Sequence, residues 1–329
     1  MKKFHNGIDS FLTDSLNGFA SAHSDLVRIQ QQPTFVIRQH LKPGKVALIS
    51  GGGSGHEPLH AGFVGHGMLD AACPGQVFTS PTPDQMLAAG DAADTGAGVL
   101  FIVKNYSGDR MNFEMATELA DFKHASVITN DDMAVENSSF TTGRRGVAGT
   151  VIVEKIVGAH AENGGDLESC RALGEHVNAA NGSMGVAFTS CTVPAAGKPT
   201  FTLAEDEMEV GVGIHGEPGR RRSKINSAAS IVEELMGVIL ENLKPNVGSE
   251  VLLHVNGLGG TPLSELYLLY GDAKTLLEKH GLKIVRSLVG NYTTALEMNG
   301  ASLTVTVLDD EIKRLWDQPV HTAAMRWGM

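Results

Sequence analysis

The densest run of residues that could carry out chemistry is a glycine-rich segment, SGGGSGHEP, at residues 50–58. It follows a short apolar stretch that predicts a buried strand, and a helix is predicted after it. Glycines in such a position let backbone N–H groups close on a small polar ligand without interference from Cβ atoms. The segment is therefore expected to be either a ligand-binding loop or a plain tight turn between a strand and a helix.

Three familiar templates fail on this segment. The nucleotide P-loop needs GxxxxGK followed by Ser or Thr, and no such run occurs in the chain. The dinucleotide fingerprint GxGxxG fails because Pro58 stands where the third glycine belongs. The hydrolase elbow GxSxG fails because His56 stands where its second glycine belongs. No nucleotide site is predicted here.

The pentapeptide HEPLH at residues 56–60 satisfies the zinc motif HExxH in its letters. That motif needs both histidines on one face of a continuous helix and a third ligand elsewhere. Here His56 ends a glycine loop and Pro58 lies inside the motif, which disfavours a continuous helix. His60 is expected to be a packed helix residue, and no metal site is predicted.

Two further residues are candidates for chemistry. Asp109 lies past the apolar run 99–103, and ligands of open α/β sheets gather beyond the carboxyl ends of strands. Its carboxylate is predicted either to accept a proton from an alcohol or to cap a helix that begins near Met111. His215 lies between Gly213 and Gly216, which keeps the ring accessible, and the alternative is a purely structural histidine at a strand end.

Strands and helices alternate in the first half of the chain. Strands are predicted at 44–50, 99–103 and 125–129, and helices at 8–22, after the turn at 80–85, and at 147–162. This alternation indicates a mainly parallel sheet that helices cover on both faces.

A second pattern begins near residue 183. It predicts strands at 184–188, 207–215, 251–256, 283–289 and 302–308, and helices at 225–243 and 263–280. The predicted fold class is therefore α/β with two domains. Residues 1–182 form an N-terminal domain with a mainly parallel sheet flanked by helices, and residues 183–329 form a smaller mixed α/β domain.

The composition excludes several classes of protein. The 329 residues include 26 Lys and Arg against 37 Asp and Glu, a net charge of -11, which argues against a nucleic-acid binder held by phosphate contacts. The three cysteines show no CxxC spacing, and no apolar run approaches the roughly 20 residues of a membrane span. We expect a cytoplasmic protein without direct contact to membranes or nucleic acids.

Seven segments carry a resemblance to a known family. They are GKVALISGGGSGHEP (44–58), FTSPTPDQ (78–85), KNYSGD (104–109), TTGRRGVAGT (141–150), CTVPAAGKP (191–199), EVGVGIHGEPG (209–219) and NGLGGTPLSELY (256–267). In these segments, which are spread over essentially the whole chain, the sequence closely resembles the K subunit of dihydroxyacetone kinases.

The resemblance implies a reaction and a site. His215 matches the histidine that holds dihydroxyacetone covalently as a hemiaminal, and a neutral imidazole nitrogen can add to a reactive ketone. His56 and Asp109 match the acid/base pair for the hydroxyl that receives the phosphate. Positions that match the lining of the substrate pocket are Gly53, Ser54, Gly55 and Lys104. Taken alone, Lys104 is equally typical of a solvated strand end.

The resemblance also implies partners. In the bacterial family the phosphate comes from ADP bound to a separate L subunit and rephosphorylated through the sugar phosphotransferase system. ADP and Mg are therefore expected on the L subunit and no cofactor in this chain, which is expected to form a homodimer. The alternative is a regulatory relative, a ketose sensor that coactivates a transcription factor; the presence of His56 and Asp109 beside His215 favours catalysis. The basic run GRRRSK at 219–224 is either a solvated loop or a surface that steers the L subunit.

Overall fold

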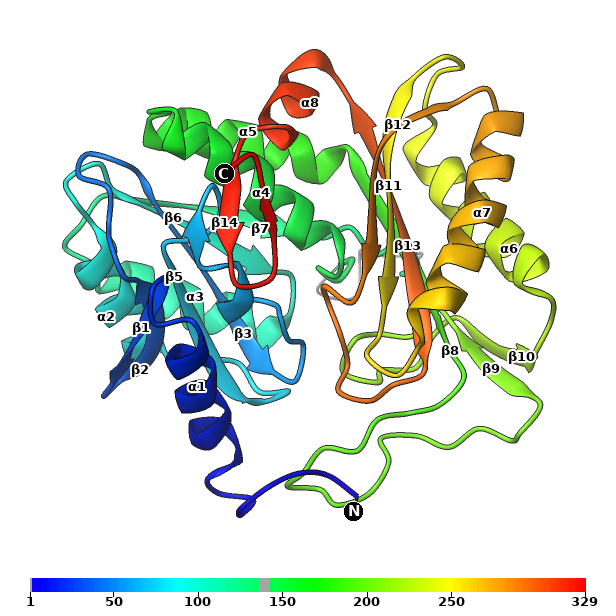
Figure 1. Cartoon of the computed structure of the whole chain (residues 1–329), viewed down its shortest axis with the longest axis horizontal. Helices are drawn as coiled ribbons and strands as arrows, with labels where there is room; N and C mark the ends of the chain where they lie inside the picture. The colour runs from blue at the N-terminus through cyan, green and yellow to red at the C-terminus, as the bar shows by residue number, and fades with distance from the viewer. Residues whose placement is uncertain (1, 136–142) are drawn as a thin grey trace.

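The computed structural model describes residues 2–135 and 143–329, and it places two large sheets on either side of a central layer of helices (Figure 1). The first sheet has the strand order β1-β2-β5-β3-β6-β7. Its strands are β1 (Val27–Gln31), β2 (Thr34–Arg38), β3 (Ala47–Ser54), β5 (Ala71–Val77), β6 (Val99–Lys104) and β7 (His124–Thr129). Strands β5, β3, β6 and β7 run parallel, whereas β1 and β2 form an antiparallel edge.

The second sheet has the strand order β10-β9-β8-β13-β11-β12 and is mixed. Its strands are β8 (Asn181–Ala187), β9 (Glu207–Val210), β10 (Arg221–Lys224), β11 (Glu250–Gly257), β12 (Lys283–Gly290) and β13 (Gly300–Leu308). Only the pair β11–β12 is parallel, and the other pairs are antiparallel. The predicted α/β fold, with a mainly parallel first sheet and a mixed second one, is confirmed.

Helices form the remaining layers. They are α1 (Phe11–Ala22), α2 (Pro83–Ala93), α3 (Ser107–Glu118), α4 (Gly149–Glu162), α5 (Leu167–Ala179), α6 (Ala228–Leu243), α7 (Leu263–Lys279) and α8 (Asp310–Trp316). Helices α2 and α3 cover the outer face of the first sheet, and α6 and α7 cover the outer face of the second (Figure 1). No helix in the described ranges is both long and apolar enough to cross a membrane.

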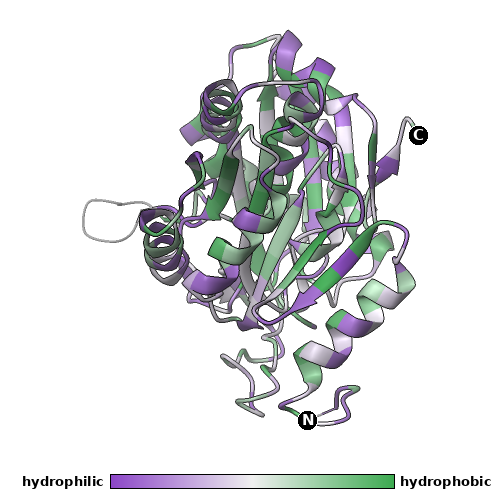
Figure 2. Ribbon diagram, turned by 90° about the vertical axis from the view of Figure 1, so that its left-hand side faces the viewer, coloured by the Kyte–Doolittle hydropathy of each residue, from purple (hydrophilic) through white to green (hydrophobic). Residues whose placement is uncertain are grey.

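Helix α4 is the centre of the molecule. Its apolar side chains, such as Val153 and Ile156, share one buried cluster with Leu48 and Leu100 of the first sheet and with Leu252 of the second. Because the helix is packed on all sides, nearly every residue of the run 149–162 is buried and most of them are apolar, although Glu154, Lys155 and Glu162 are buried as well. Figure 2 shows this distribution, with hydrophobic ribbon concentrated in the interior layers.

The C-terminal segment returns to the N-terminal half of the chain and forms a small third sheet, of order β15-β14-β4, with it. Helix α8 packs against α4, and strand β14 (Val320–Thr322) pairs with β15 (Arg326–Trp327) and with the short strand β4 (Gly65–His66). Strand β8, at the start of the second sheet, begins at Asn181. Residues up to 180, which contain the first sheet, are called the first unit, and residues 181–308, which contain the second sheet, are called the second unit. The division into domains 1–182 and 183–329 stays a prediction, and the last residues of the chain pack against the first unit.

Several predicted elements differ from those observed. The glycine segment is followed by bends and turns at 55–60 and by one 3-10 turn, η1 (Ala61–Phe63), instead of the predicted helix; Pro58, which has no backbone N–H to donate, lies within this stretch. Strand β9 ends at Val210, so residues 211–219 form a loop that includes Gly211 and Gly216 at positive φ. The basic run at 219–224 is mostly strand β10 and not a loop.

Candidate functional site

The site lies where the carboxyl ends of β3 and β6 meet loops of the second unit. The residues after β3 are fastened to the loop between β12 and β13: the Thr294 N–H donates to the His56 carbonyl at 3.2 Å, and the Leu296 N–H donates to the Gly55 carbonyl at 2.8 Å. The His56 ring adds a third bond, since its Nδ1 lies 2.7 Å from the Thr294 carbonyl. These bonds hold His56 at the junction of the two units.

A glycine is required next to His56. Gly55 has a φ of +101°, and a Cβ there would lie 2.8 Å from the ring of Phe78. The Phe78 ring instead stacks on the His56 ring with centroids 4.9 Å apart and an interplanar angle of 13°. The two residues before Gly55 hold β3 to β5. Gly53 pairs with Gly75 of β5, and the Ser54 hydroxyl donates to the Gly75 carbonyl at 2.7 Å.

His215 is oriented by a carboxylate two residues away. Its Nδ1 lies 2.9 Å from Glu217 Oε1, and its backbone N–H donates to Glu217 Oε2 at 2.9 Å. Burial raises the pKa of Glu217, but the hydrogen bond and charge of His215 and the nearby Arg145 outweigh burial and lower that pKa to about 2. The ionised carboxylate keeps the proton on Nδ1, so Nε2 carries the free lone pair.

Three aromatic rings surround the His215 ring edge-on. The ring centroids are 4.7 Å from His56, 5.3 Å from Phe78 and 4.6 Å from Tyr106. The buried atoms His56 Nε2 and Tyr106 Oη have no hydrogen-bond partner among the described residues. Unpaired polar atoms are costly inside a protein, so two of them beside one histidine mark a place where a polar ligand belongs.

The electrostatics of the site keep His56 neutral. Burial, and then the proximity of His215 and Lys104, lower the pKa of His56 well below its ordinary value. Burial together with the Glu217 carboxylate raises the pKa of Tyr106, which keeps its hydroxyl protonated. A neutral imidazole and a phenol can both exchange hydrogen bonds with a hydroxyl or carbonyl oxygen.

Asp109 is not a helix cap. Helix α3 begins at Ser107, so Asp109 lies inside its first turn and is 3% exposed. Its Oδ1 accepts a hydrogen bond from the Ser80 hydroxyl, and its Oδ2 lies 3.5 Å from Lys104 Nζ. Lys104 is fully buried, so the interpretation as a solvated strand end is wrong as well. Both residues face the same interior space at the end of β6.

The two histidines of the HExxH motif do not lie on a helix. Residues 55–60 are turns, and the two histidines have separate partners: His56 pairs with Thr294, while His60 pairs with Glu154 and Lys104. His60 is thus part of a buried polar network and not a packed helix residue. In the described ranges no group of three or more His, Cys, Asp or Glu side chains could hold a metal ion.

Comparisons with known proteins identify the family. A model of the Dak1 domain matches residues 17–324. The chain belongs to the Dak1 domain family. The resemblance to dihydroxyacetone kinase K subunits is thereby confirmed for the fold and the family.

Named relatives of this Dak1 chain include two bacterial subunits. The chain is 48% identical to the "PEP-dependent dihydroxyacetone kinase, dihydroxyacetone-binding subunit DhaK" of Escherichia coli strain K12, with 100% of both chains covered. It is 52% identical to the "PTS-dependent dihydroxyacetone kinase 1, dihydroxyacetone-binding subunit DhaK" of Listeria innocua, with 94% of this chain and 95% of the relative covered.

Two solved structures have the same fold as this Dak1 chain. The "Dihydroxyacetone kinase operon co-activator Dha-DhaQ" superposes with a TM-score of 0.90 at 34% identity, covering 94% of this chain and 97% of that one. The dihydroxyacetone kinase of C. freundii superposes with a TM-score of 0.87 at 34% identity. In the latter case 98% of this chain covers 60% of the longer kinase.

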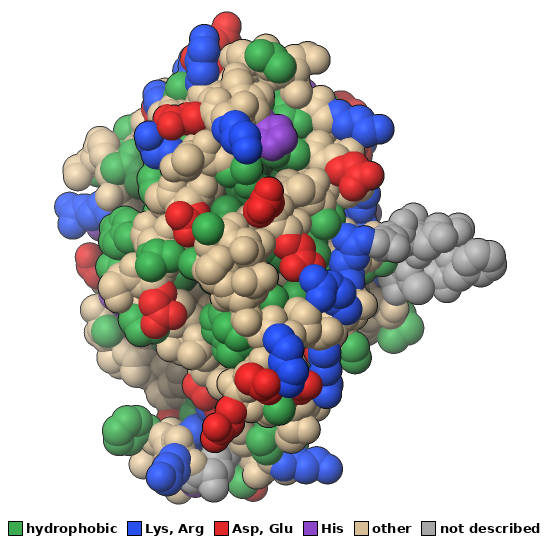
Figure 3. Space-filling view, turned by 90° about the vertical axis from the view of Figure 1, so that its right-hand side faces the viewer, with side chains coloured by type: hydrophobic (Ala, Val, Ile, Leu, Met, Phe, Trp, Pro, Cys, Tyr) green, Lys and Arg blue, Asp and Glu red, His purple; other side chains and the backbone are tan. Residues whose placement is uncertain are grey.

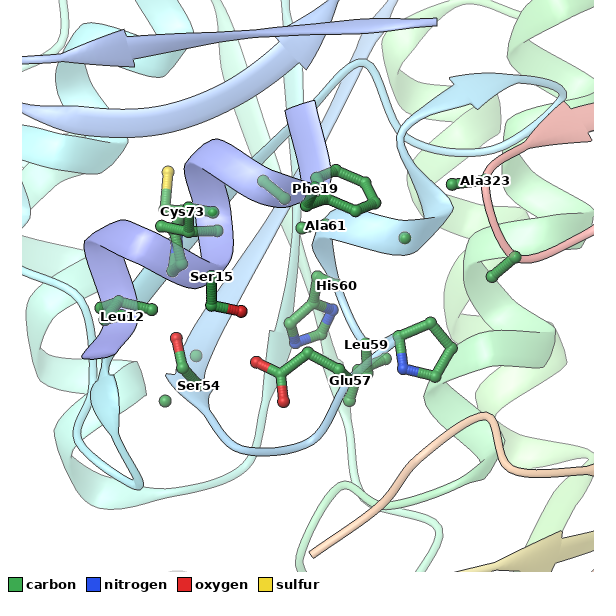
Figure 4. A pocket seen from close by; sticks show the side chains of 18 of the residues that line it. Leu12, Ser15, Phe19, Ser54, Glu57, Leu59, His60, Ala61, Cys73 and Ala323 are labelled. Carbon is green, nitrogen blue, oxygen red and sulfur yellow. The ribbon is translucent and has the colours of Figure 1, made fainter. Parts of the chain in front are cut away.

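A cavity under α1 is separate from this site. It has a volume of about 420 Å³ and lies under α1, where Leu12, Leu16 and Phe19 form one wall (Figure 4). Gly53, Ser54 and His60 border it, but His56, Lys104, Asp109 and His215 do not.

Arg145 links the loop of His215 to the first unit. Its guanidinium donates to Asp132 Oδ2 at 2.7 Å from Nε and to the Gly211 carbonyl at 3.0 Å from Nη2. Within the segment 143–150, Arg145 therefore connects the two units. Residues 141 and 142 of the matching run lie outside the described residues.

The basic run at 219–224 is neutralised by local partners. Arg221 pairs with Glu234 at 2.8 Å, Arg222 pairs with Glu209 at 2.9 Å, and Lys224 pairs with Asp206 at 2.7 Å. On the face formed by α6 and α7, basic and acidic side chains are interspersed (Figure 3). Steering by this run is therefore expected to be weak.

Sequence reasoning missed several residues of the Dak1 site. Four of them lie inside the segments that carry the resemblance, and this position could have identified them as site residues: Phe78, Ser80, Tyr106 and Glu217. Glu154 gave a different signal, because it is a carboxylate inside the apolar run VIVEKIV of α4. A charge in a helix that is packed on all sides is expected to have a buried partner.

Proposed function

We propose that this chain is the dihydroxyacetone-binding subunit of a dihydroxyacetone kinase that depends on the phosphotransferase system. The names and high identity of the E. coli and Listeria relatives support this function. The observation that carries it is the His215 ring, whose tautomer Glu217 sets, beside the unpaired atoms His56 Nε2 and Tyr106 Oη.

In the first step His215 captures the ketose. The Nε2 lone pair attacks the ketone carbon, a bond forms between nitrogen and carbon, and the carbonyl oxygen takes up a proton to become a hydroxyl. Nδ1 gives up its proton through the hydrogen bond to Glu217, so the net change is an N–H exchanged for an O–H. His56 and Tyr106 donate to or accept from the oxygens of the bound triose. Covalent capture compensates for the few contacts that three carbons can make.

In the second step a hydroxyl of the captured ketose is phosphorylated. Asp109 accepts the proton of that hydroxyl, while Ser80 holds its other carboxylate oxygen. The Lys104 ammonium lies 3.5 Å from the Oδ2 atom of the same carboxylate. This chain therefore positions the ketose and accepts the proton of its hydroxyl. The remaining requirement of phosphoryl transfer, neutralisation of the charge on the phosphate, is left to the donor subunit.

The phosphate donor is proposed to be ADP-bound phosphate on a separate L subunit that also holds Mg. We further propose that the chain forms a homodimer and is located in the cytoplasm. No P-loop or dinucleotide fingerprint occurs in the sequence, which supports a donor on another chain.

A co-activator of a kinase operon is the second candidate, and the TM-score of 0.90 to such a protein favours it. The identity of 34% to the co-activator is lower than the 48% and 52% to the kinase subunits, which supports the kinase.

A coupled phosphorylation assay tests the choice. The purified chain is mixed with dihydroxyacetone and an L subunit from the same organism whose bound ADP has been rephosphorylated, and dihydroxyacetone phosphate is measured. Turnover that depends on this chain is expected. Capture of the ketose without any turnover would support the co-activator, and neither capture nor turnover would reject both candidates.

A further inference from the structure

A line of buried polar groups runs from Asp109 into the middle of the molecule. Asp109 Oδ2 is 3.5 Å from Lys104 Nζ, Lys104 Nζ is 3.1 Å from His60 Nε2, and His60 Nδ1 is 2.6 Å from Glu154 Oε1. The four side chains are at most 6% exposed. They come from α3, β6, the turn after β3, and α4, so four separate parts of the chain build this line.

One arrangement of protons satisfies every contact in the line. A carboxylate at Glu154 accepts the Nδ1–H of a neutral His60, which leaves Nε2 free to accept from the Lys104 ammonium. The three groups then form a chain of charge-assisted hydrogen bonds without an unpaired donor between them. Glu154 thus acts on Lys104 through the histidine.

The backbone leaves room for this arrangement. A Cβ at Gly52 would lie 2.2 Å from Lys104 Nζ and 3.5 Å from His60 Nε2. The Gly51 carbonyl is 3.4 Å from the same ammonium. The glycine strand therefore accommodates the ammonium group, and Gly52 is needed for that contact in addition to any contact with substrate.

The distances show what the line does to Asp109. Its Oδ1 is taken by the Ser80 hydroxyl, so Oδ2 is the oxygen left for a substrate proton. Lys104 Nζ lies 3.5 Å from Oδ2, beyond the usual range of 2.7–3.2 Å, because its hydrogen bond goes to His60. We propose that Glu154 and His60 are positioning residues, which hold the Lys104 ammonium back from Asp109 so that Oδ2 stays free to act as the base.

The inference rests on the proposed function, since it assigns Asp109 as the base of phosphoryl transfer. Without the Glu154 charge, the hydrogen bond from Lys104 to His60 is weaker and no longer offsets the attraction between Lys104 and Asp109. The ammonium then moves onto Oδ2 and occupies the oxygen that should take the proton. Ketose capture at His215 does not use this oxygen and stays intact.

Protonation of Glu154 should have the same consequence as removal of its charge. Burial raises the pKa of Glu154 to about 8, against the attraction of Lys104. The other titratable groups near this line are His60 and His56 from the turn after β3 and Asp109 from α3, and burial followed by the Lys104 charge lowers the pKa of His60. Turnover should therefore rise with pH as Glu154 ionises.

The experiment compares two substitutions on one helix. Glu154→Gln removes the charge from the line, and Glu162→Gln removes another buried charge from α4, one that pairs with Arg38 and not with the site. In the coupled assay above pH 8, where Glu154 is ionised in the wild type, Glu154→Gln should lower kcat by about tenfold or more and change the KM for dihydroxyacetone by less than about threefold; it should also abolish the rise in rate near pH 8. Glu162→Gln should keep the wild-type kcat and pH profile.

A second measurement does not need activity. Nitrogen-15 NMR of histidine side chains in the wild-type protein should show His60 as the neutral Nδ1–H tautomer above pH 8, assigned with His60→Gln. The inference is overturned if His60 carries its proton on Nε2 under these conditions, or if Glu154→Gln matches Glu162→Gln in kcat and pH profile. If Glu154→Gln does not fold, His60→Gln takes its place in the assay. An inactive wild type would reject the proposed function, while the tautomer would still decide the hydrogen-bond line.

Discussion

The two histidines at the centre of the site come from different units and have opposite surroundings. His56, from the first unit, is 1% exposed, and its Nδ1 is bonded to a backbone carbonyl. His215, from the second unit, has a side chain that is 20% exposed and is bonded to a carboxylate. The rings are 4.7 Å apart.

The difference shows how one residue type takes two roles. A carbonyl accepts a hydrogen bond but adds no negative charge, so His56 stays neutral and serves as a hydrogen-bonding group. The Glu217 carboxylate fixes the tautomer of His215 and stabilises positive charge as it develops on the ring, which suits a nucleophile. The exposure of His215 also leaves a path for substrate, which the burial of His56 does not.

The strongest test of this comparison removes the nucleophile. His215→Ala should abolish covalent capture of dihydroxyacetone without unfolding the protein, because the ring lies on a loop at the edge of the core. Intact mass spectrometry and calorimetry check this. His176→Ala is the matched control, since His176 is more exposed, bonded to Asp309, and remote from the site. Normal capture by His215→Ala would remove His215 from the mechanism.

The next largest effect is expected at the base. Asp109→Asn should still capture the ketose but should transfer phosphate about 10²–10⁴-fold more slowly, because an amide cannot accept the proton of the alcohol. The coupled assay and a calorimetric titration separate the two steps. Asp70→Asn, which alters another buried carboxylate of the first unit, is the control for general destabilisation. Turnover near that of the wild type would assign Asp109 a structural role.

A smaller effect is expected at the residue that orients His215. Glu217→Gln should weaken capture on the order of 10²-fold, because the amide no longer holds the proton on Nδ1. Since the pKa of Glu217 is lowered to about 2, its contribution is present above the ordinary carboxyl value and is lost only as the pH falls toward 2. Capture should therefore not lose this contribution between pH 5 and pH 8.

Glu209→Gln is the matched control for Glu217→Gln. Glu209 is a buried carboxylate of β9 that accepts from the Gly219 N–H and from Arg222 and does not contact His215. If both substitutions weaken capture equally, the carboxylate of Glu217 has no specific role in setting the tautomer.

The smallest effect is expected from the basic run at 219–224. Replacing Arg221 and Arg222 with Ser should change the apparent KM for the L subunit by less than about threefold, because both arginine side chains are about half exposed and already have acidic partners. Initial rates across salt concentrations measure this. A large rise in KM that disappears at high salt would show that the run does steer the partner.

The sequence predicted the layers well and the site in part. Periodicity found β3, β6, β7 and most of α4, since buried strands and an apolar helix leave plain patterns. The hairpin of β1 and β2, the edge strand β10 and helix α5 were missed. The edge strands β1 (VRIQQ) and β10 (RRSK) are largely polar, and α5 lies just before the expected domain boundary at 182.

The sequence could identify several site residues but not the residues that they contact, and the reason is physical. Residues such as His56 and Asp109 could be named because they lie in recognisable segments. Their partners could not, because the pairs join distant positions: His56 with Thr294, and His60 with Glu154. The burial of Lys104 likewise depends on α4 covering the end of β6, which no local pattern predicts.

The central claim is that His215 Nε2 bonds to the ketone carbon. The most direct test is NMR of dihydroxyacetone labelled with carbon-13 at the ketone carbon, bound to protein labelled with nitrogen-15 in histidine. We expect the carbonyl signal to be replaced by that of a tetrahedral carbon with a one-bond coupling to one histidine nitrogen, and we expect the coupled signal to be absent in His215→Ala. A bound ligand that keeps its carbonyl signal and shows no coupling would contradict the account.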